Sequence, residues 1–169
     1  MNIYVLLKRT FDTEEKITLS NGKINEDGAE FIINPYDEYA VEEAIVVRDA
    51  HGGEVTVVSV GSEEAEKQLR TALAMGADKA VLINIEDDVE DGDQYTTSKV
   101  IAEYLKDKEA DLIIAGNVAI DSGSGQVGPR VAEILEIPYI TTITKLEING
   151  ETATVVRDVE GDSEVIEAS

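Results

Sequence analysis

The 169-residue sequence contains no cysteine, no tryptophan and a single histidine, His51. The absence of cysteine excludes disulfides, thiol nucleophiles and thiolate-bound metals. One histidine without cysteine also leaves too few of the usual ligands for a transition-metal cluster, and we find no Ser/His/Asp triad. His51 precedes Gly52 and Gly53 at the end of a predicted helix, where we expect it to interact with the helix C-terminus. We therefore predict no catalytic residue.

Basic residues are also scarce, because 14 Lys and Arg stand against 36 Asp and Glu, giving a net charge of -22. Such a surface repels nucleic acid and anionic lipid, so we exclude nucleic-acid binding. The acids are spread along the chain between intact apolar segments, as in a folded protein. Two interpretations remain: a halophilic protein whose self-repulsion is screened by salt, which we favour, and an ordinary acidic cytosolic protein.

Long apolar runs are missing as well. The N-terminal apolar stretch is too short for a signal peptide, and no run approaches the ~18 residues of a membrane span. We expect a soluble, cytoplasmic protein without membrane insertion. The length and the 43% hydrophobic content fit a single domain, residues 1–169. The sequence ends within a predicted strand, which indicates a truncated polypeptide or a single excised domain.

Nearly continuous apolar runs of strand length alternate with helical patterns. The runs are residues 3–7 (IYVLL), 54–60 (EVTVVSV), 79–85 (KAVLINI) and 111–116 (DLIIAG). Continuous apolar strands separated by helices are typical of a parallel sheet covered on both faces. The fold class predicted is therefore α/β, an open and mainly parallel sheet with helices on both faces. From Tyr139 onward an antiparallel ribbon is expected, with an Asn-Gly turn at 149 and 150, and residues 16–28 resemble a small hairpin.

Four helices are predicted from caps and periodicity. The first follows Pro35 and stops at Gly52, and the second runs from a Ser62 cap to Gly76. Asp93 is expected to cap the third, and the fourth covers about residues 126–136. The acidic segment 87–93 (DDVEDGD) lies before the third helix; we favour a solvated turn there over a hard-metal site.

The loop at residues 116–126 is the most informative segment. Its glycines permit close backbone approach, while its serines and the first amides of the following helix supply hydrogen-bond donors for an anion. The pattern alone leaves a phosphate site and a plain connection equally open, since it is neither a Walker A nor a GxGxxG motif. Ligands of open α/β sheets lie beyond the carboxyl ends of the strands, and this loop leaves such an end. The segments LLKRTFD and SVGSEE do the same, so the mononucleotide interpretation becomes the better one.

Three segments carry a family resemblance: FIINPYDEYAVEEAI, VTVVSVGSEEAEKQLRTALAMGADKAVLI and DLIIAGNVAIDSGSGQVGPRVAEIL. They resemble the beta subunit of electron transfer flavoproteins, and the likeness covers the whole chain. Such beta subunits continue into a C-terminal arm that this sequence does not contain. The resemblance implies an adenine-nucleotide alpha-hydrolase-like, or Rossmann-like, domain that pairs with an alpha subunit carrying FAD. The complex takes electrons from acyl-CoA or other dehydrogenases to a respiratory or ferredoxin-type acceptor.

The same resemblance implies AMP as the cofactor of ordinary carriers and a second FAD in electron-bifurcating ones. Asn34 and Asp37 look suited to adenine or ribose, and the loop to phosphate. The implied cofactor-binding residues are Leu6, Asn34, Pro35, Tyr36, Asp37, Val60, Asp93, Thr97, Gly116, Asn117, Val118, Ala119, Ile120, Asp121, Ser122, Gly123, Ser124, Gly125, Gln126 and Val127.

Two departures from the family pattern bear on the cofactor. Asp121 is followed by Ser122, Gly123 and Ser124 where the family often has a second acid, which changes the expected phosphate geometry. Residues 92–98 (GDQYTTS) resemble a segment of bifurcating members, but Gln94 replaces a threonine near the flavin. Both AMP and FAD therefore stay open.

Two rival functions are considered. A stand-alone adenine-nucleotide sensor similar to universal stress proteins would bind nucleotide and homodimerise without an alpha subunit. A nucleotide-dependent ligase or hydrolase would need an SGGxDS-type loop after the first strand, where this sequence has KRTFDT, so this rival is the weakest. We predict a non-enzymatic electron-carrier subunit, and expect that the chain alone exposes its partner-facing surface, which would favour self-association.

Overall fold

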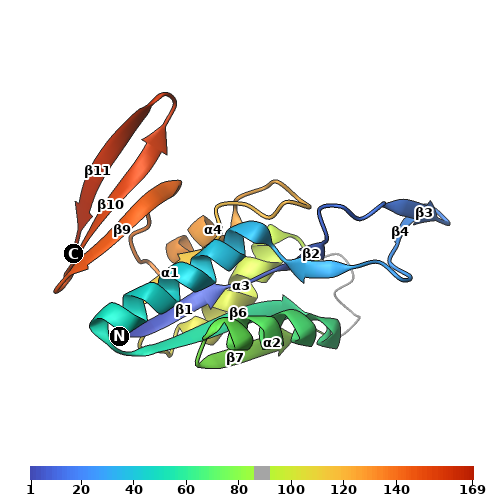
Figure 1. The fold of residues 1–169 in the computed structure, drawn as a ribbon, viewed down its shortest axis with the longest axis horizontal. Helices are drawn as coiled ribbons and strands as arrows, with labels where there is room; N and C mark the ends of the chain where they lie inside the picture. The colour runs from blue at the N-terminus through green and yellow to red at the C-terminus, as the bar shows by residue number, and fades with distance from the viewer. Residues whose placement is uncertain (86–91) are drawn as a thin grey trace.

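The computed structural model describes residues 1–85 and 92–169, and its central sheet is parallel as predicted. The sheet has the order β7-β6-β1-β8. Its strands are β1 (Asn2–Leu6), β6 (Glu54–Gly61), β7 (Lys79–Asn84) and β8 (Leu112–Ala115). The first strand of the chain therefore lies inside the sheet, between β6 and β8 (Figure 1).

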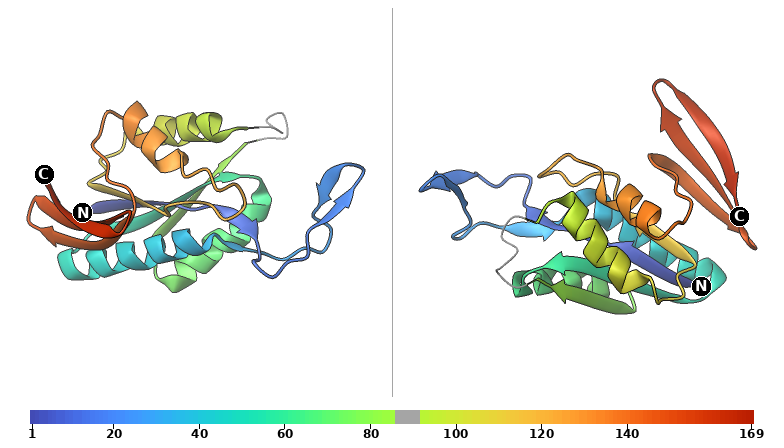
Figure 2. Two further views of the ribbon diagram at one scale, coloured as in Figure 1. Left: turned by 90° about the horizontal axis from the view of Figure 1, so that it is seen from above. Right: turned by 180° about the vertical axis from the view of Figure 1, so that it is seen from behind.

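Helices cover both faces of this sheet, as the continuous apolar strands predict. The helices are α1 (Pro35–His51), α2 (Glu66–Met75), α3 (Gln94–Leu105) and α4 (Val127–Ile134). Ile3, Val5 and Val57 pack with α1 and α2 in one hydrophobic cluster. The alternate residues Leu6 and Val58 pack with α3 and α4 in a second cluster on the other face, and Figure 2 shows the two helical layers.

The antiparallel ribbon near the C-terminus is confirmed as a sheet of order β11-β10-β9. Its strands are β9 (Ile143–Asn149), β10 (Thr152–Val159) and β11 (Asp162–Ala168). The turn lies one residue later than predicted: Asn149 pairs with Thr152, so Gly150 and Glu151 form the loop. Gly150 adopts φ 66°, which makes it the residue that permits this tight turn.

A slender projection lies at the opposite end of the molecule from this sheet (Figure 1). The predicted small hairpin is present as β3 (Thr18–Ser20) and β4 (Lys23–Asn25), joined at Asn21 and Gly22. Two further short strands, β2 (Arg9–Phe11) and β5 (Phe31–Ile33), pair at its base. The sequence predicts neither, because three residues are too few to show a period.

Most of the predicted helix ends are confirmed, and one is wrong. Gly52 and Gly76 follow the last residues of α1 and α2, and the Asp93 carboxylate caps α3 by accepting from the Thr96 amide at 2.8 Å. Ser62 makes no side-chain cap; it precedes a short 3-10 helix, η1 (Glu63–Ala65), before α2 begins. The chain tightens into a 3-10 turn there, a common way to start an α-helix.

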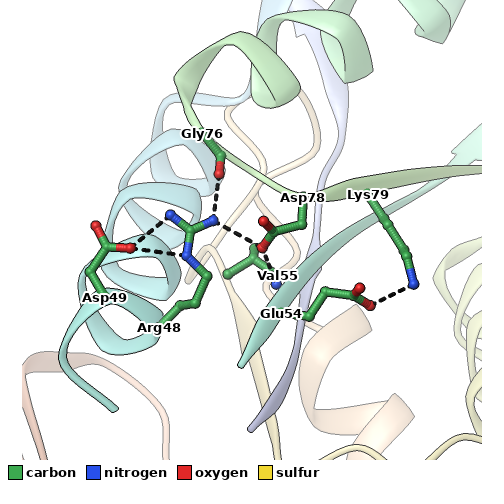
Figure 3. A network of polar contacts seen from close by, with 7 residues as sticks. All are labelled: Arg48, Asp49, Glu54, Val55, Gly76, Asp78 and Lys79. Carbon is green, nitrogen blue, oxygen red and sulfur yellow. Dashed lines mark hydrogen bonds and ion pairs between the residues drawn. The ribbon is translucent and has the colours of Figure 1, made fainter. Parts of the chain in front are cut away.

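The amino end of the sheet is held by a network of polar contacts centred on Arg48 (Figure 3). The Arg48 guanidinium donates to the Gly76 carbonyl at 2.6 Å and to the Asp78 carboxylate at 2.9 Å. Asp78 also accepts the Val55 amide at 2.8 Å, so the network joins the last turn of α1 to β6 and to the turn before β7. Beside it, Lys79 pairs with Glu54 at 2.8 Å.

Candidate functional site

A cavity of about 220 Å³ opens at the carboxyl ends of the parallel strands. Its walls come from the ends of β1, β6 and β8, the first turns of α1, α3 and α4, and the loop of residues 116–126. The structure thus brings the three predicted strand ends together. The predicted site residues in its lining are Leu6, Asp37, Val60, Asp93, Thr97, Gly116, Asn117, Val118, Ala119, Ser122, Ser124, Gly125, Gln126 and Val127.

Six predicted residues lie outside the lining. Three of them, Asn34, Pro35 and Tyr36, form the entry to α1, and Asn34 is buried at 1% exposure. The others belong to the outer part of the loop: Ile120, Asp121 and Gly123. The family resemblance places these residues in the site, whereas the loop residues that reach the cavity are 116–119, 122 and 124–126.

The lining also contains residues outside the implied cofactor-binding set: Leu7, Lys8, Gly92, Gln94, Ile101, Ala115, Gly128 and Pro129. Lys8 could have been found, because it is a cation directly after a buried strand in an acidic chain. Ile101 and Gly128 carry no such signal, since they reach the cavity through the packing of α3 and α4.

Asp37 bridges two neighbouring strand ends from the first turn of α1. One carboxylate oxygen accepts the Lys8 amide at 2.7 Å, and the other accepts the Gly116 amide at 3.2 Å. Lys8 follows β1 and Gly116 follows β8. The side chain is 6% exposed, so these bonds satisfy a carboxylate that water barely reaches.

Burial raises the pKa of Asp37 from 3.8 to about 6. Hydrogen bonds from the Lys8 amide, the Asn34 side chain and the Gly116 amide act in the opposite direction, as does the Lys8 ammonium. Desolvation wins because neutral amide donors compensate a buried charge less well than water does. At neutral pH Asp37 is therefore mainly ionised, and the desolvation of its carboxylate costs free energy.

Asn34 makes two bonds to the loop from its buried position. Its side-chain amide donates to the Val118 carbonyl at 3.0 Å, and its side-chain oxygen accepts the Ile120 amide at 3.1 Å. The Asn34 backbone carbonyl meanwhile accepts the Asp37 amide at 2.8 Å and begins α1. Both polar ends of this side chain are thus used within the protein.

Gly116 is required by the close approach of the loop to α1. A Cβ atom there would lie 2.2 Å from a carboxylate oxygen of Asp37 and 2.8 Å from its backbone nitrogen. No side chain fits at such distances. Further along, Gly123 and Gly125 have φ of 65° and 59°, a conformation that favours glycine.

The loop ends at the N-terminus of α4, where donors are available. The first intrahelical bond runs from the Arg130 amide to the Gln126 carbonyl, so the amides of Val127 and Gly128 have no partner within the helix. Free amides and the positive end of the helix dipole together favour an anion at a helix N-terminus. Pro129 contributes no donor.

One cation, Lys8, is found among the lining residues of the cavity. Its ammonium pairs with the Asp121 carboxylate at 2.7 Å, and the two side chains are 47% and 30% exposed. Asp121 therefore contacts the lining through its ion pair although it lies outside the wall. The Lys8 ammonium lies beside the loop, where the Asp121 carboxylate balances its charge.

Residues 87–91 of the acidic segment lie outside the described residues, so neither the solvated turn nor the metal site is tested there. Within residues 1–85 and 92–169, no group of three or more His, Asp or Glu could hold a metal ion. In the same ranges no helix combines the length and the apolar character needed to cross a membrane.

The fold and the cavity define an α/β domain with a cavity at the carboxyl edge of its parallel sheet, the edge at which ligands of open α/β sheets bind. The family model of the electron transfer flavoprotein domain matches residues 21–169. The chain belongs to the electron transfer flavoprotein family, and within it to the beta subunits.

The relatives give the same result across the whole chain. An electron transfer flavoprotein subunit beta of Bacillus subtilis is 68% identical over 169 residues, and one of Syntrophomonas wolfei is 44% identical over 170. Both alignments cover 100% of this chain. A caffeyl-CoA reductase-Etf complex subunit CarD of Acetobacterium woodii is 39% identical over 171 residues and 99% of this chain. The chain spans 66%, 66% and 64% of the length of these relatives.

Proposed function

We propose that this chain is the nucleotide-binding part of an electron-carrier beta subunit, and that its cavity holds AMP or the corresponding part of FAD. The observation that supports this most is the cavity itself, in which three strand ends and a small-residue loop meet. Family membership supports the role in electron transfer. It also favours the carrier over the stand-alone sensor.

The residues present fit a nucleotide phosphate. The unpaired amides of Val127 and Gly128, the hydroxyls of Ser122 and Ser124 and the Lys8 ammonium supply donors around one small volume. Phosphate oxygens accept such donors at a helix N-terminus. The apolar residues Leu6, Val60 and Ile101 supply a surface for the adenosine.

FAD, when bound, supplies the chemistry that carries electrons. The residues of this chain bind the nucleotide and orient it. AMP and FAD share the adenosine monophosphate moiety, so one set of contacts would serve both. The name of the Acetobacterium relative, a subunit of a reductase complex, keeps a second FAD open alongside AMP. We further propose that an alpha subunit and a dehydrogenase complete the carrier, and that this subunit is not itself an enzyme.

The test uses the full-length protein copurified with its alpha partner. Nucleotides are released by denaturation and identified by mass spectrometry. AMP with one FAD per heterodimer supports the ordinary carrier, and two FAD support a bifurcating one. The absence of any nucleotide from the beta subunit would refute the site. A homodimer that retains nucleotide without an alpha subunit would favour the sensor.

A pair of matched variants tests whether the nucleotide lies in the cavity. Thr97→Trp adds a large side chain at the cavity wall, and Thr71→Trp adds the same side chain on the exposed surface of α2. We expect the first to lose the copurifying nucleotide and the second to keep it. Equal retention by both variants would show that the nucleotide lies elsewhere.

A further inference from the structure

Two polar side chains in the entry to α1, Asn34 and Asp37, have an unusual set of partners. Four hydrogen bonds of these side chains go to backbone atoms of other segments: Lys8, Gly116, Val118 and Ile120. Three of these four lie in the loop that borders the cavity. The loop backbone is therefore fixed from outside by α1.

We propose that Asn34 and Asp37 are positioning residues, which hold loop 116–126 through its backbone and thereby set the affinity of the cavity for its ligand. This inference rests on the proposed nucleotide binding, but the hold on the loop can be measured without any nucleotide. Asn34 makes its two bonds two residues apart in the loop, and Asp37 ties the start of the loop to the end of β1.

Gly116 strengthens the geometric argument. The loop approaches α1 so closely at this residue that no Cβ could be accommodated next to the Asp37 carboxylate. Further into the loop, the Gly123 amide bonds to the Ala119 carbonyl at 2.8 Å, which closes a compact turn directly after the Asn34 contacts. The hydrogen bonds of Asn34 and Asp37 thus fix the position of the loop backbone against α1.

The position of Asp37 also makes the hold depend on pH. Opening of the loop would expose the Asp37 carboxylate to water and return its pKa from about 6 toward 3.8. The open state then binds the proton more weakly than the closed state, so a rise in pH favours opening. The charged groups around it are Lys8, which is paired with Asp121, the adjacent Glu38 on α1, and Asp93 in the cavity lining.

Anion binding should respond in the same direction. A nucleotide phosphate meets less repulsion from a protonated Asp37, and it needs the closed loop. We therefore expect the affinity to rise as the pH falls through 6, beyond what the titration of the nucleotide itself causes.

The experiment is hydrogen exchange of the full-length protein without nucleotide, followed by mass spectrometry of peptides that cover residues 112–127. After correction for intrinsic exchange rates, the opening constant of the loop should increase about tenfold between pH 5 and pH 7 in the wild type. Asp37→Asn should abolish this dependence. Asn34→Ala should raise the exchange of the Ile120 amide about tenfold at every pH, because this amide loses the Asn34 side-chain oxygen as its acceptor.

Asp78→Asn is the matched control. It changes the same residue type at the amino end of the sheet, where the Asp78 carboxylate accepts the backbone amide of Val55. It should leave the opening constant of the loop and its pH dependence unchanged. If Asp37→Asn does not fold, the pH titration of the wild type and the Asn34→Ala variant still decide the matter.

The affinity for AMP is then measured by calorimetry for the same proteins at pH 5.5 and 7.5. The pH dependence that separates wild type from Asp37→Asn is the signature of positioning, because the titration of AMP is common to both. If the opening constant of the loop changes neither with pH nor in the Asn34→Ala variant, the inference is wrong. If the loop responds as stated but AMP does not bind to the wild type, the proposed function fails while the hold on the loop stands.

Discussion

At each end of the central sheet an aspartate accepts backbone amides in or next to a strand, yet the surroundings of the two carboxylates differ. At the carboxyl end, Asp37 is buried, it accepts the backbone amides of Lys8 and Gly116, and burial raises its pKa. At the amino end, the Asp78 side chain is 39% exposed, and the Val55 amide and the Arg48 guanidinium lower its pKa. The surroundings of Asp78 at the amino end stabilise its ionised form, whereas burial destabilises the ionised form of Asp37 at the carboxyl end.

This contrast indicates where stability and function lie in the sheet. The ion-paired network of Arg48 and Asp78 at the amino end stabilises the fold at neutral pH. A desolvated carboxylate at the carboxyl end costs free energy that a purely structural contact would avoid. Functional sites commonly hold such costly groups. The predictions below test this difference.

The largest effect is expected for Gly116→Ala. The added Cβ would overlap Asp37, so the loop must move away from α1. We expect a loss of about 3 kcal/mol in the free energy of unfolding. Denaturant unfolding measures this value. The control is Gly128→Ala, whose Cβ would lie at an ordinary 3.6 Å from the Ala115 side chain. A comparable loss in both variants would contradict the close approach at Gly116.

The second prediction sets Asp37→Asn against Asp78→Asn across pH. The folded-state pKa of Asp37 is raised to about 6, so the wild type binds this proton more tightly when folded and loses stability as the pH rises from 4 toward 7. The stability of the wild type relative to Asp37→Asn should thus fall by about 2 kcal/mol over this range.

Asp78 should behave in the opposite way. Its folded-state pKa is lowered, so its contribution is present above pH 4 and is lost as the pH falls through the folded-state value. The free energies of unfolding of the wild type and of Asp78→Asn should therefore become more similar as the pH falls. Denaturant unfolding at pH 3 to 7 measures both differences, and parallel trends for the two aspartates would break the comparison between the sheet ends.

The third prediction compares a cation at each end. The Arg48 side chain is 17% exposed and donates to the Gly76 carbonyl, so Arg48→Met should cost about 1 to 2 kcal/mol of stability without changing nucleotide content. Lys8→Met removes a more exposed ion pair and should cost at most about 1 kcal/mol. It should nevertheless weaken nucleotide binding. Thermal unfolding and nucleotide quantification on the same samples check both statements.

The smallest effect per residue belongs to the acidic surface that both ends share. If the net charge of -22 is an adaptation to salt, the free energy of unfolding should rise from low salt to about 2 M KCl as repulsion is screened. The Arg48→Met variant should gain at least as much, since it lacks a pair that salt would weaken. Unchanged wild-type stability would favour the ordinary acidic protein.

The sequence predicts the elements better than it predicts their contacts. The apolar runs and the stops at Gly52 and Gly76 are local signals, and the parallel sheet with helices on both faces follows from them. The partners of Asn34 are not local, because they lie more than 80 residues further along the chain. The family resemblance therefore implies that Asn34 is a site residue, but it cannot show that the side chain bonds to the loop backbone.

The errors at Ser62 and at the Asn149 turn have a related cause. A serine before acidic residues and an Asn-Gly pair are both good local motifs, but each is compatible with two neighbouring registers. At the turn, the pairing of β9 with β10 selects Gly150 and Glu151, and before α2 the chain uses a 3-10 turn instead of a side-chain cap. Tertiary pairing decides between registers that the local sequence leaves equal.

The place of β1 inside the sheet has a consequence for synthesis. Ile3 is among the first residues to leave the ribosome, yet it pairs with Leu112, which emerges much later. Until then one edge of an apolar strand has no partner, which is the kind of exposed edge that aggregates. The central sheet can be completed only after translation has passed β8, so we expect the nascent chain to depend on chaperones up to that point.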